Sequence, residues 1–234
     1  FRRAARATRK LAPGSSEIGP LAQLRFLASL LAPPLCAICG RACEPRDSAC
    51  PTCLGAIEGC GGAGRLRGWP VAWAVPYEGA GRRLVAALKF GSRLELAGIA
   101  GSLVAAAAVR ADLVGPQTVV VPVPAAPVRR RRRGFDPGEL IAAATAAELG
   151  IPVARCLARR SGRRQVGRDR RARLATPPRV GVVGDVPPRA LVVDDVLTTG
   201  ATLGACAEAL LGQGCAEIAA AVFARALGPV AAGA

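Results

Sequence analysis

Apolar residues fall into short runs that alternate with longer alanine-rich segments, and this alternation is typical of an α/β fold. The runs Val71–Val75 and Thr118–Val121 are aliphatic and contain β-branched residues, so they predict strands buried in a parallel sheet. The segment Glu139–Leu149 predicts a helix that ends at Gly150. Further strands are predicted at 151–157, 190–193 and 217–224, and further helices at 21–31, 81–90, 94–110 and 202–213.

The length and the hydrophobic content allow one full domain and one small module. The chain has 234 residues, of which 51% are hydrophobic, and this is enough for a core of ordinary size. Strands 190–193 and 217–224 with the helix between them form a βαβ unit, whose strands lie parallel in one sheet. The predicted parts are a basic arm with a short helix over 1–33, a cysteine-rich module and linker over 34–68, an α/β domain over 69–228 and a frayed tail over 229–234.

The chain carries a strong excess of basic residues, and only part of this excess is evidence for a binding partner. The formal net charge is +16, which favours contact with nucleic acid or another polyanion. Lys10 and Lys89 are the only lysines, however, and every other basic residue is arginine. Together with the many Ala, Gly and Pro residues, this indicates a GC-rich genome, so codon bias explains part of the arginine excess.

No segment predicts a membrane-spanning helix, because the uncharged runs are too short or are broken by Gly and Pro. The N-terminus mimics an export signal, with arginines and then a Leu-rich stretch before Cys36. Arg25 splits that stretch, and Pro33-Pro34 end it without a small-residue cleavage site. We therefore expect a cytoplasmic protein, with a secretory or lipoprotein signal as the alternative.

Two C-x-x-C pairs predict a metal site near the N-terminus. Cys36 and Cys39 form the first pair, and Cys50 and Cys53 form the second, with ten residues between the pairs. Four thiolates at this spacing favour a tetrahedral zinc site, and a site closed by four protein ligands is structural rather than catalytic. A redox disulfide pair and a module without metal are the alternatives. The competing ligands are Cys43 and Cys60.

The most informative stretch runs from Ala190 to Thr202. A buried strand leads into Asp194 and Asp195, and a loop of small and hydroxyl residues then opens a helix. Backbone N–H groups at such a helix start bind anions, whereas two carboxylates favour sugar hydroxyls or a metal-bridged group, so a ribose 5-phosphate satisfies both halves. An ordinary βα turn with a threonine N-cap explains the hydroxyls but not the acidic pair. The predicted phosphate loop consists of Thr198, Thr199, Gly200, Ala201 and Thr202.

The acidic pair and its loop resemble the 5-phosphoribosyl-1-diphosphate (PRPP) motif of type I phosphoribosyltransferases, which need a second anion site for the diphosphate. The loop after strand 118–121 suits this role, since it lies at the carboxyl edge where open α/β sheets bind ligands. The predicted diphosphate loop consists of Val123, Pro124, Ala125 and Ala126. The arginine-rich segments 129–133 and 159–173 are predicted as loops near this site, the second as a mobile cover. A solvated basic loop is the alternative for the first. The candidate residues of these loops are Arg132, Arg133, Gln165 and Arg168.

Together these features resemble the ComF family, whose members join an N-terminal zinc ribbon to a Rossmann-like, type I phosphoribosyltransferase domain. The resemblance covers about Pro34 to Arg225. It implies a protein that binds PRPP, with Asp194 and Asp195 as catalytic residues, a structural zinc and magnesium bound with PRPP. It also implies a role in natural competence, with single-stranded DNA and proteins of the competence machinery as partners. Its carriers are the cysteine pairs, the acidic loop, Tyr77-Glu78-Gly79, Leu88-Lys89-Phe90, Val121–Pro124, Arg131–Phe135 and Gln165.

Two departures from the family pattern lie beside the diphosphate loop. Asp136-Pro137 stands where the family commonly has Asn-Gln, so an amide pair is lost and a charge is gained. Ala125-Ala126 stands where many members have a leucine and a histidine. Two alternatives therefore stay open: a metabolic phosphoribosyltransferase that acts on a base or amine, and a non-catalytic regulator that senses PRPP.

Overall fold

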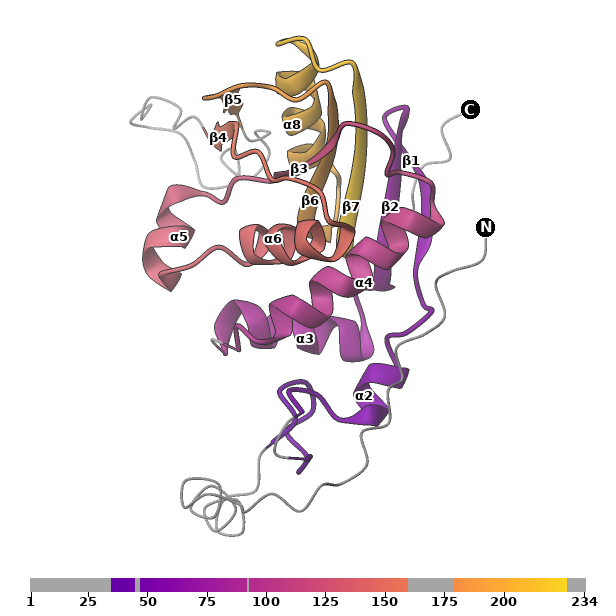
Figure 1. The fold of residues 1–234 in the computed structure, drawn as a ribbon. Helices are drawn as coiled ribbons and strands as arrows, with labels where there is room; N and C mark the ends of the chain where they lie inside the picture. The colour runs from indigo at the N-terminus through magenta and orange to yellow at the C-terminus, as the bar shows by residue number, and fades with distance from the viewer. Residues whose placement is uncertain (1–34, 45–46, 92, 160–178, 227–234) are drawn as a thin grey trace, which may run out of the picture.

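The structure, a computed structural model, describes residues 35–44, 47–91, 93–159 and 179–226. Its helices are α2 (Pro51–Gly55), α3 (Gly79–Phe90), α4 (Leu96–Arg110), α5 (Pro127–Arg133), α6 (Pro137–Leu149) and α8 (Ala201–Leu211). Its strands are β1 (Gly62–Leu66), β2 (Trp69–Pro76), β3 (Thr118–Pro122), β4 (Leu157–Arg159), β5 (Val180–Val182), β6 (Arg189–Leu197) and β7 (Glu217–Arg225) (Figure 1).

A sheet with the strand order β1-β2-β7-β6-β3 forms the centre of the described fold. Strands β2, β7, β6 and β3 pair in parallel, and β1 adds an antiparallel edge next to β2. Most residues of the central strands are aliphatic and buried, among them 190–193 of β6 and 218–222 of β7, as their unbroken apolar runs predict. The predicted α/β class, with a parallel sheet flanked by helices, is therefore confirmed.

Helices cover both faces of this sheet (Figure 1). α3, α4 and α6 share one core with sheet residues such as Leu191 and Phe223. α8 and the small β4–β5 sheet form a second core with Val192 and its neighbours. Small residues let the two helices α4 and α6 approach each other closely, since a Cβ atom on Gly101 of α4 would lie 2.4 Å from the Cβ of Ala144 in α6.

The cysteine-rich module packs against the same core as α3 and α4. Its buried residues Cys36, Ile38 and Ile57 belong to one apolar cluster with Leu84 of α3 and Leu96 of α4. The short helix α2 lies close to α3 in Figure 1. Apolar burial therefore joins the module to the domain, in addition to the covalent connection.

Residues 62–66, which the sequence predicts as part of a linker, form strand β1. The strand pairs with β2 from Gly62 opposite Trp73 to Leu66 opposite Trp69. A Cβ atom on Gly62 would lie 2.6 Å from the ring of Trp73. The glycines of this segment therefore allow the strand to approach the indole ring, and the linker interpretation is wrong here.

Residues 151–157 do not form the predicted strand. A single bridge joins Val153 to Val120 of β3, and β4 begins only at Leu157. Pro152 has no N–H to donate, so a ladder of hydrogen bonds with β3 does not form along this segment.

The arginine run predicted as a loop is part of helix α5. Pro127 stands in the first turn, and Gly134 ends the helix with a φ of +78°. Arginine is a good helix former, and the run contains no other helix breaker. The basic side chains therefore project from a helix rather than from a loop.

Candidate functional site

A cavity of about 290 Å³ lies at the carboxyl ends of β3 and β6, the edge where the sequence predicts ligand binding. From the predicted site residues it brings together Asp194, Asp195, Val123, Pro124, Ala125, Ala126, Arg133, Thr198 and Thr202. To these it adds Tyr77, Lys89, Asp136 and Arg159. Thr199, Gly200, Ala201 and Arg132 are not among its lining residues. Gln165 and Arg168 lie outside the residues that the structure describes.

The acidic pair lies within β6, which is longer than the predicted strand 190–193. Pairing with β7 continues to Leu197 opposite Arg225, so both carboxylates are held on extended backbone. Asp194 accepts a hydrogen bond through Oδ1 from the backbone N–H of Asp195, at 2.8 Å. The strand therefore fixes the two carboxylates at the cavity before any ligand binds.

Lys89 contacts the acidic pair, although the sequence alone assigns it no role there. Its Nζ donates to Oδ1 of Asp195 at 2.8 Å, and the two side chains are only 20% and 15% exposed. The residue comes from the last turn of α3, 106 positions away along the chain. The sequence contains one indication of a role for Lys89, because lysine is almost absent from a chain whose other basic residues are arginine.

Asp194 is the more strongly perturbed member of the pair. Burial raises its pKa, and the neighbouring charge of Asp195 raises it further, to about 8. Lys89 and the Asp195 N–H act in the opposite direction but do not compensate. Asp194 is therefore largely protonated at neutral pH in the ligand-free protein, and a bound cation favours its ionised form.

This raised pKa predicts that Asp194 makes the folded state less stable as the pH rises. Between the unfolded pKa of about 3.9 and the folded pKa of about 8, the folded state holds more protons at Asp194. The free energy of unfolding then falls by up to about 1.4 kcal/mol per pH unit. In Asp194→Asn this contribution is absent, so the variant loses less stability over the same range. Urea unfolding at about pH 5 and about pH 8 measures both slopes, and equal slopes would contradict the assignment.

The phosphate loop has the backbone geometry of an anion site. Gly200 has a φ of +74° and precedes the first turn of α8. This backbone conformation favours glycine, and a Cβ atom on Gly200 would also lie 2.5 Å from the end of the Leu66 side chain in β1. The hydroxyl of Thr199 accepts from the N–H of Ala201 at 3.4 Å. The start of α8 thus presents N–H groups and threonine hydroxyls beside the cavity.

The diphosphate loop is held by side chains on both sides. Asp136 accepts from the Ala125 N–H at 3.1 Å, and Arg159 donates through Nε to the Pro124 carbonyl at 3.0 Å. Arg133 lines the same cavity, with its guanidinium 5.1 Å from the ring centroid of Phe90. Cationic side chains and the loop backbone therefore face the space next to the acidic pair.

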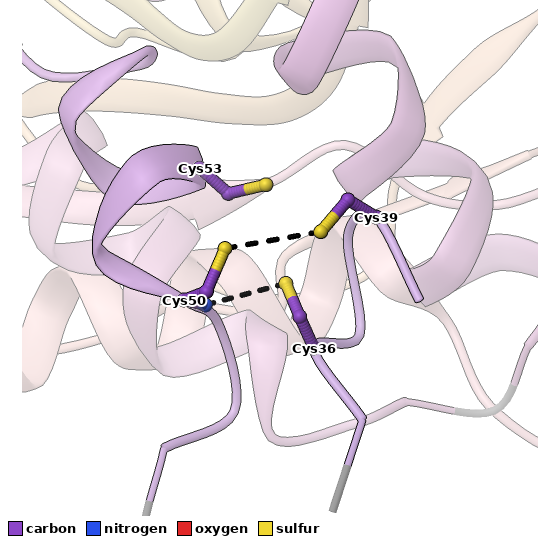
Figure 2. Close-up of side chains that lie close together, drawn as sticks. All are labelled: Cys36, Cys39, Cys50 and Cys53. Atoms are coloured by element: carbon purple, nitrogen blue, oxygen red, sulfur yellow. Dashed lines mark hydrogen bonds between the residues drawn. The ribbon is translucent and has the colours of Figure 1, made fainter. Parts of the chain in front are cut away.

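The four predicted cysteine ligands lie together in the structure. The Sγ atoms of Cys36, Cys39, Cys50 and Cys53 are all within 4.8 Å of one another (Figure 2). Sγ of Cys39 lies 3.8 Å from Sγ of Cys50. Sulfur atoms at the corners of a tetrahedron around Zn²⁺ are about 3.8 Å apart when each Zn–S bond is about 2.3 Å. The sulfur cluster therefore fits a zinc ion bound by four thiolates.

The surroundings of the cluster favour thiolates at two of its members. The backbone N–H and then the side chain of Arg41 lower the pKa of Cys39 to about 6. Burial raises the pKa of Cys36, but N–H groups that include that of Cys50 outweigh it, so the net shift is downward. Burial, and after it the contacts with its cysteine neighbours, together raise the pKa of Cys53 to about 12. A divalent cation among the sulfurs would offset the accumulated negative charge.

Neither competing cysteine belongs to this group. Cys43 directs its Sγ to the carbonyl of Asp47 at 3.3 Å, and exposed Cys60 directs its Sγ to backbone carbonyls of its own segment. The ligand set that the geometry supports is therefore the one formed by the two C-x-x-C pairs.

Comparison with known protein families finds a match in the C-terminal part of the chain. A family described as "Phosphoribosyl transferase domain" matches residues 136–230, which include the acidic pair and the phosphate loop. The chain contains a phosphoribosyl transferase domain. This matched domain occupies less than half of the chain, and the diphosphate loop and cysteine module precede it. No curated protein matches the chain.

Two solved structures, one of them named as a phosphoribosyltransferase, are similar to the chain at a low level. Orotate phosphoribosyltransferase from Aeropyrum pernix is 24% identical, and the match covers 74% of this chain and 80% of that chain with a TM-score of 0.35. UMP synthase from Leishmania donovani is 16% identical, with 72% of this chain and 29% of that chain covered and a TM-score of 0.31. The chain thus spans less than a third of the UMP synthase.

Across the parts of the chain that the structure describes, no helix combines the length and apolar character needed to cross a membrane.

Proposed function

We propose that the cavity binds PRPP with Mg²⁺ and that the protein transfers its phosphoribosyl group to a nitrogen nucleophile. One observation carries this proposal: the acidic pair, the phosphate loop and the diphosphate loop meet around a single cavity. PRPP contains a 5-phosphate, ribose hydroxyls and a diphosphate, and each of these groups has a matching part of that lining. The matched phosphoribosyl transferase domain supports the same conclusion.

The proposed roles follow from the chemistry of each group. Residues 198–202 hold the 5-phosphate through backbone N–H groups and hydroxyls. Asp194 and Asp195 hold the ribose hydroxyls, and Arg133 and Arg159 face the diphosphate beside its loop. The carboxylate oxygens are ligands of the kind that Mg²⁺ prefers, and Mg²⁺ supplies neutralising charge to the diphosphate.

Transfer requires little covalent chemistry from the protein. The bond between ribose C1 and the diphosphate oxygen breaks, and the electron pair leaves with the diphosphate. A bond from C1 to the acceptor nitrogen forms, and the proton that this nitrogen loses passes to solvent water. Positive charge develops on the ribose ring during this exchange, and the nearby carboxylates stabilise it. Positioning and electrostatics therefore account for catalysis without a histidine, which the chain does not contain.

Released diphosphate tests the transfer. The protein is incubated with Mg-PRPP and, in turn, with nucleobases and ammonia, and diphosphate is measured with a coupled enzyme assay. Transfer predicts release that depends on one of these acceptors and that Asp195→Asn abolishes. Binding of PRPP without release for any acceptor would instead favour the non-catalytic regulator.

We further propose contact with single-stranded DNA, as the resemblance to the competence-associated ComF family implies. Helix α5 carries the exposed residues Arg130, Arg131 and Arg132. Phe90 is 77% exposed and lies under the guanidinium of Arg133. Exposed arginines contact phosphates, and an exposed aromatic ring offers a surface on which a base stacks. This basic and aromatic surface supports the proposal.

Salt dependence tests this second proposal. Binding of a single-stranded oligonucleotide is expected to weaken steeply as the salt concentration rises, because arginine contacts release counterions. Replacing Arg131 and Arg132 with alanine should reduce the slope of log K against log salt by up to about 1.4, at about 0.7 for each contact. Fluorescence anisotropy measures both slopes. Absent or salt-independent binding would contradict the proposal.

A further inference from the structure

The diphosphate loop has few backbone N–H groups to offer a ligand. Residues 123–126 have three, since Pro124 has none. The N–H of Val123 donates to the Val193 carbonyl at 3.0 Å, which ties the loop to β6. The N–H of Ala125 donates to Oδ2 of Asp136 at 3.1 Å. Of these three N–H groups, only that of Ala126 has no hydrogen-bond partner among the described residues.

A second hydrogen bond fixes the position of Asp136, so that its carboxylate keeps the Ala125 N–H of the diphosphate loop occupied. Its other carboxylate oxygen accepts from the Gly138 N–H at 3.0 Å and caps helix α6. Pro137 follows it at the start of that helix. One side chain therefore joins the start of α6 to the diphosphate loop, and its position is set by the helix rather than by the loop.

Asp136 also adds negative charge to a cavity that already contains two carboxylates. A Cβ atom on Gly138 would lie 3.5 Å from Oδ1 of Asp136 and 3.5 Å from Oδ1 of Asp194, so the two oxygens flank the same small space. Burial raises the pKa of Asp136, and the charge of Asp195 raises it further. This carboxylate is thus unfavourably placed for an arriving diphosphate, which carries like charge.

We infer that Asp136 is a positioning residue that restrains the diphosphate loop and lowers its affinity for diphosphate. To bind diphosphate fully, the loop must break the bond from Ala125 to Asp136. The consecutive N–H groups of Ala125 and Ala126 then face the anion together, in the arrangement of a backbone anion nest. The restraint acts on the diphosphate end of PRPP and leaves the 5-phosphate end unaffected. This inference rests on the proposed function, because it assigns the loop to diphosphate.

Asp136→Asn releases the restraint while it preserves the helix cap. The amide oxygen still accepts from Gly138, and asparagine caps helices as well as aspartate does. The amide NH₂ then faces Ala125 and cannot accept its N–H. We expect Mg-diphosphate to bind about tenfold more tightly, the effect of one gained charge-assisted hydrogen bond. The affinity for ribose 5-phosphate and the melting temperature should stay near those of the unmodified protein.

Glu139→Gln is the matched control, because it removes the same charge three positions along α6. Its carboxylate pairs with Arg155, and the described residues show no hydrogen bond from it to the loop. Calorimetric titrations with Mg-diphosphate and with ribose 5-phosphate are made on all three proteins. An unchanged or weaker diphosphate affinity in Asp136→Asn, or an equal gain in Glu139→Gln, would overturn the inference. Failure of the proposed function gives a different result, since ribose 5-phosphate would then bind to none of the three proteins.

Discussion

Asp195→Asn is expected to lower the affinity for Mg-PRPP by about 100-fold and to abolish release of diphosphate. The Asp195 carboxylate lies at the cavity, is 15% exposed and is held by the 2.8 Å bond from Lys89. A hydrogen bond to a charged group contributes about 1.5–3 kcal/mol, and each 1.4 kcal/mol is a factor of ten. The amide also leaves the partly buried ammonium of Lys89 without an ionised partner, next to the site of the ribose.

The control for this variant removes the same charge elsewhere. Asp112 is exposed, lies after α4 and does not line the cavity, so Asp112→Asn should bind Mg-PRPP as the unmodified protein does. Asparagine tolerates the φ of +55° at this position. Calorimetric titration measures both affinities. Similar affinities in the two variants would remove Asp195 from the proposed site.

Loss of zinc is expected to have the largest effect on stability. Cys39→Ser removes one of four ligands, so the metal content should fall from about one zinc ion per chain to nearly none. Structural zinc contributes about 10–16 kcal/mol of apparent binding free energy in small zinc modules. The buried module residues share a core cluster with α3 and α4, so unfolding of the module also exposes that part of the domain. We therefore expect a lower melting temperature for the whole chain.

Cys60→Ser is the matched control, because Cys60 is exposed and lies outside the sulfur cluster. Metal analysis by mass spectrometry and thermal unfolding of both variants measure the effect. Chelation of zinc from the unmodified protein should reproduce the behaviour of Cys39→Ser. Retention of one zinc ion in Cys39→Ser, or equal loss in Cys60→Ser, would show that the ligand assignment is wrong.

Features that depend on neighbouring residues could be predicted from the sequence. The buried strands were predicted because parallel strands are continuous apolar runs. The acidic pair and phosphate loop were predicted because one short segment contains both, and the cysteine cluster because C-x-x-C spacing determines how each turn presents its thiolates. The structure shows these segments in the expected order, and it brings the predicted phosphate and diphosphate loops to one cavity.

Features that depend on distant contacts could not be predicted in this way. Lys89 reaches Asp195 across 106 positions, and no local pattern encodes that contact. The sequence shows that Asp136 places a charge beside the diphosphate loop, but its bond to Ala125 depends on how α5 and α6 are placed. The strand β1 was hidden because its glycines, required by the packing on Trp73, have the composition of a linker. Tertiary packing overrides local propensity in β1, whereas the other two features are contacts between distant segments.

Calorimetric titration of the full chain with Mg-PRPP, alone and in the presence of competitors, tests the central claim most directly. The account predicts one binding site per chain. It also predicts that ribose 5-phosphate and Mg-diphosphate each weaken PRPP binding, because each occupies one end of the same cavity. Binding of PRPP that neither compound weakens, or no binding of PRPP at all, would contradict the claim that the acidic pair and the two loops form a single PRPP site.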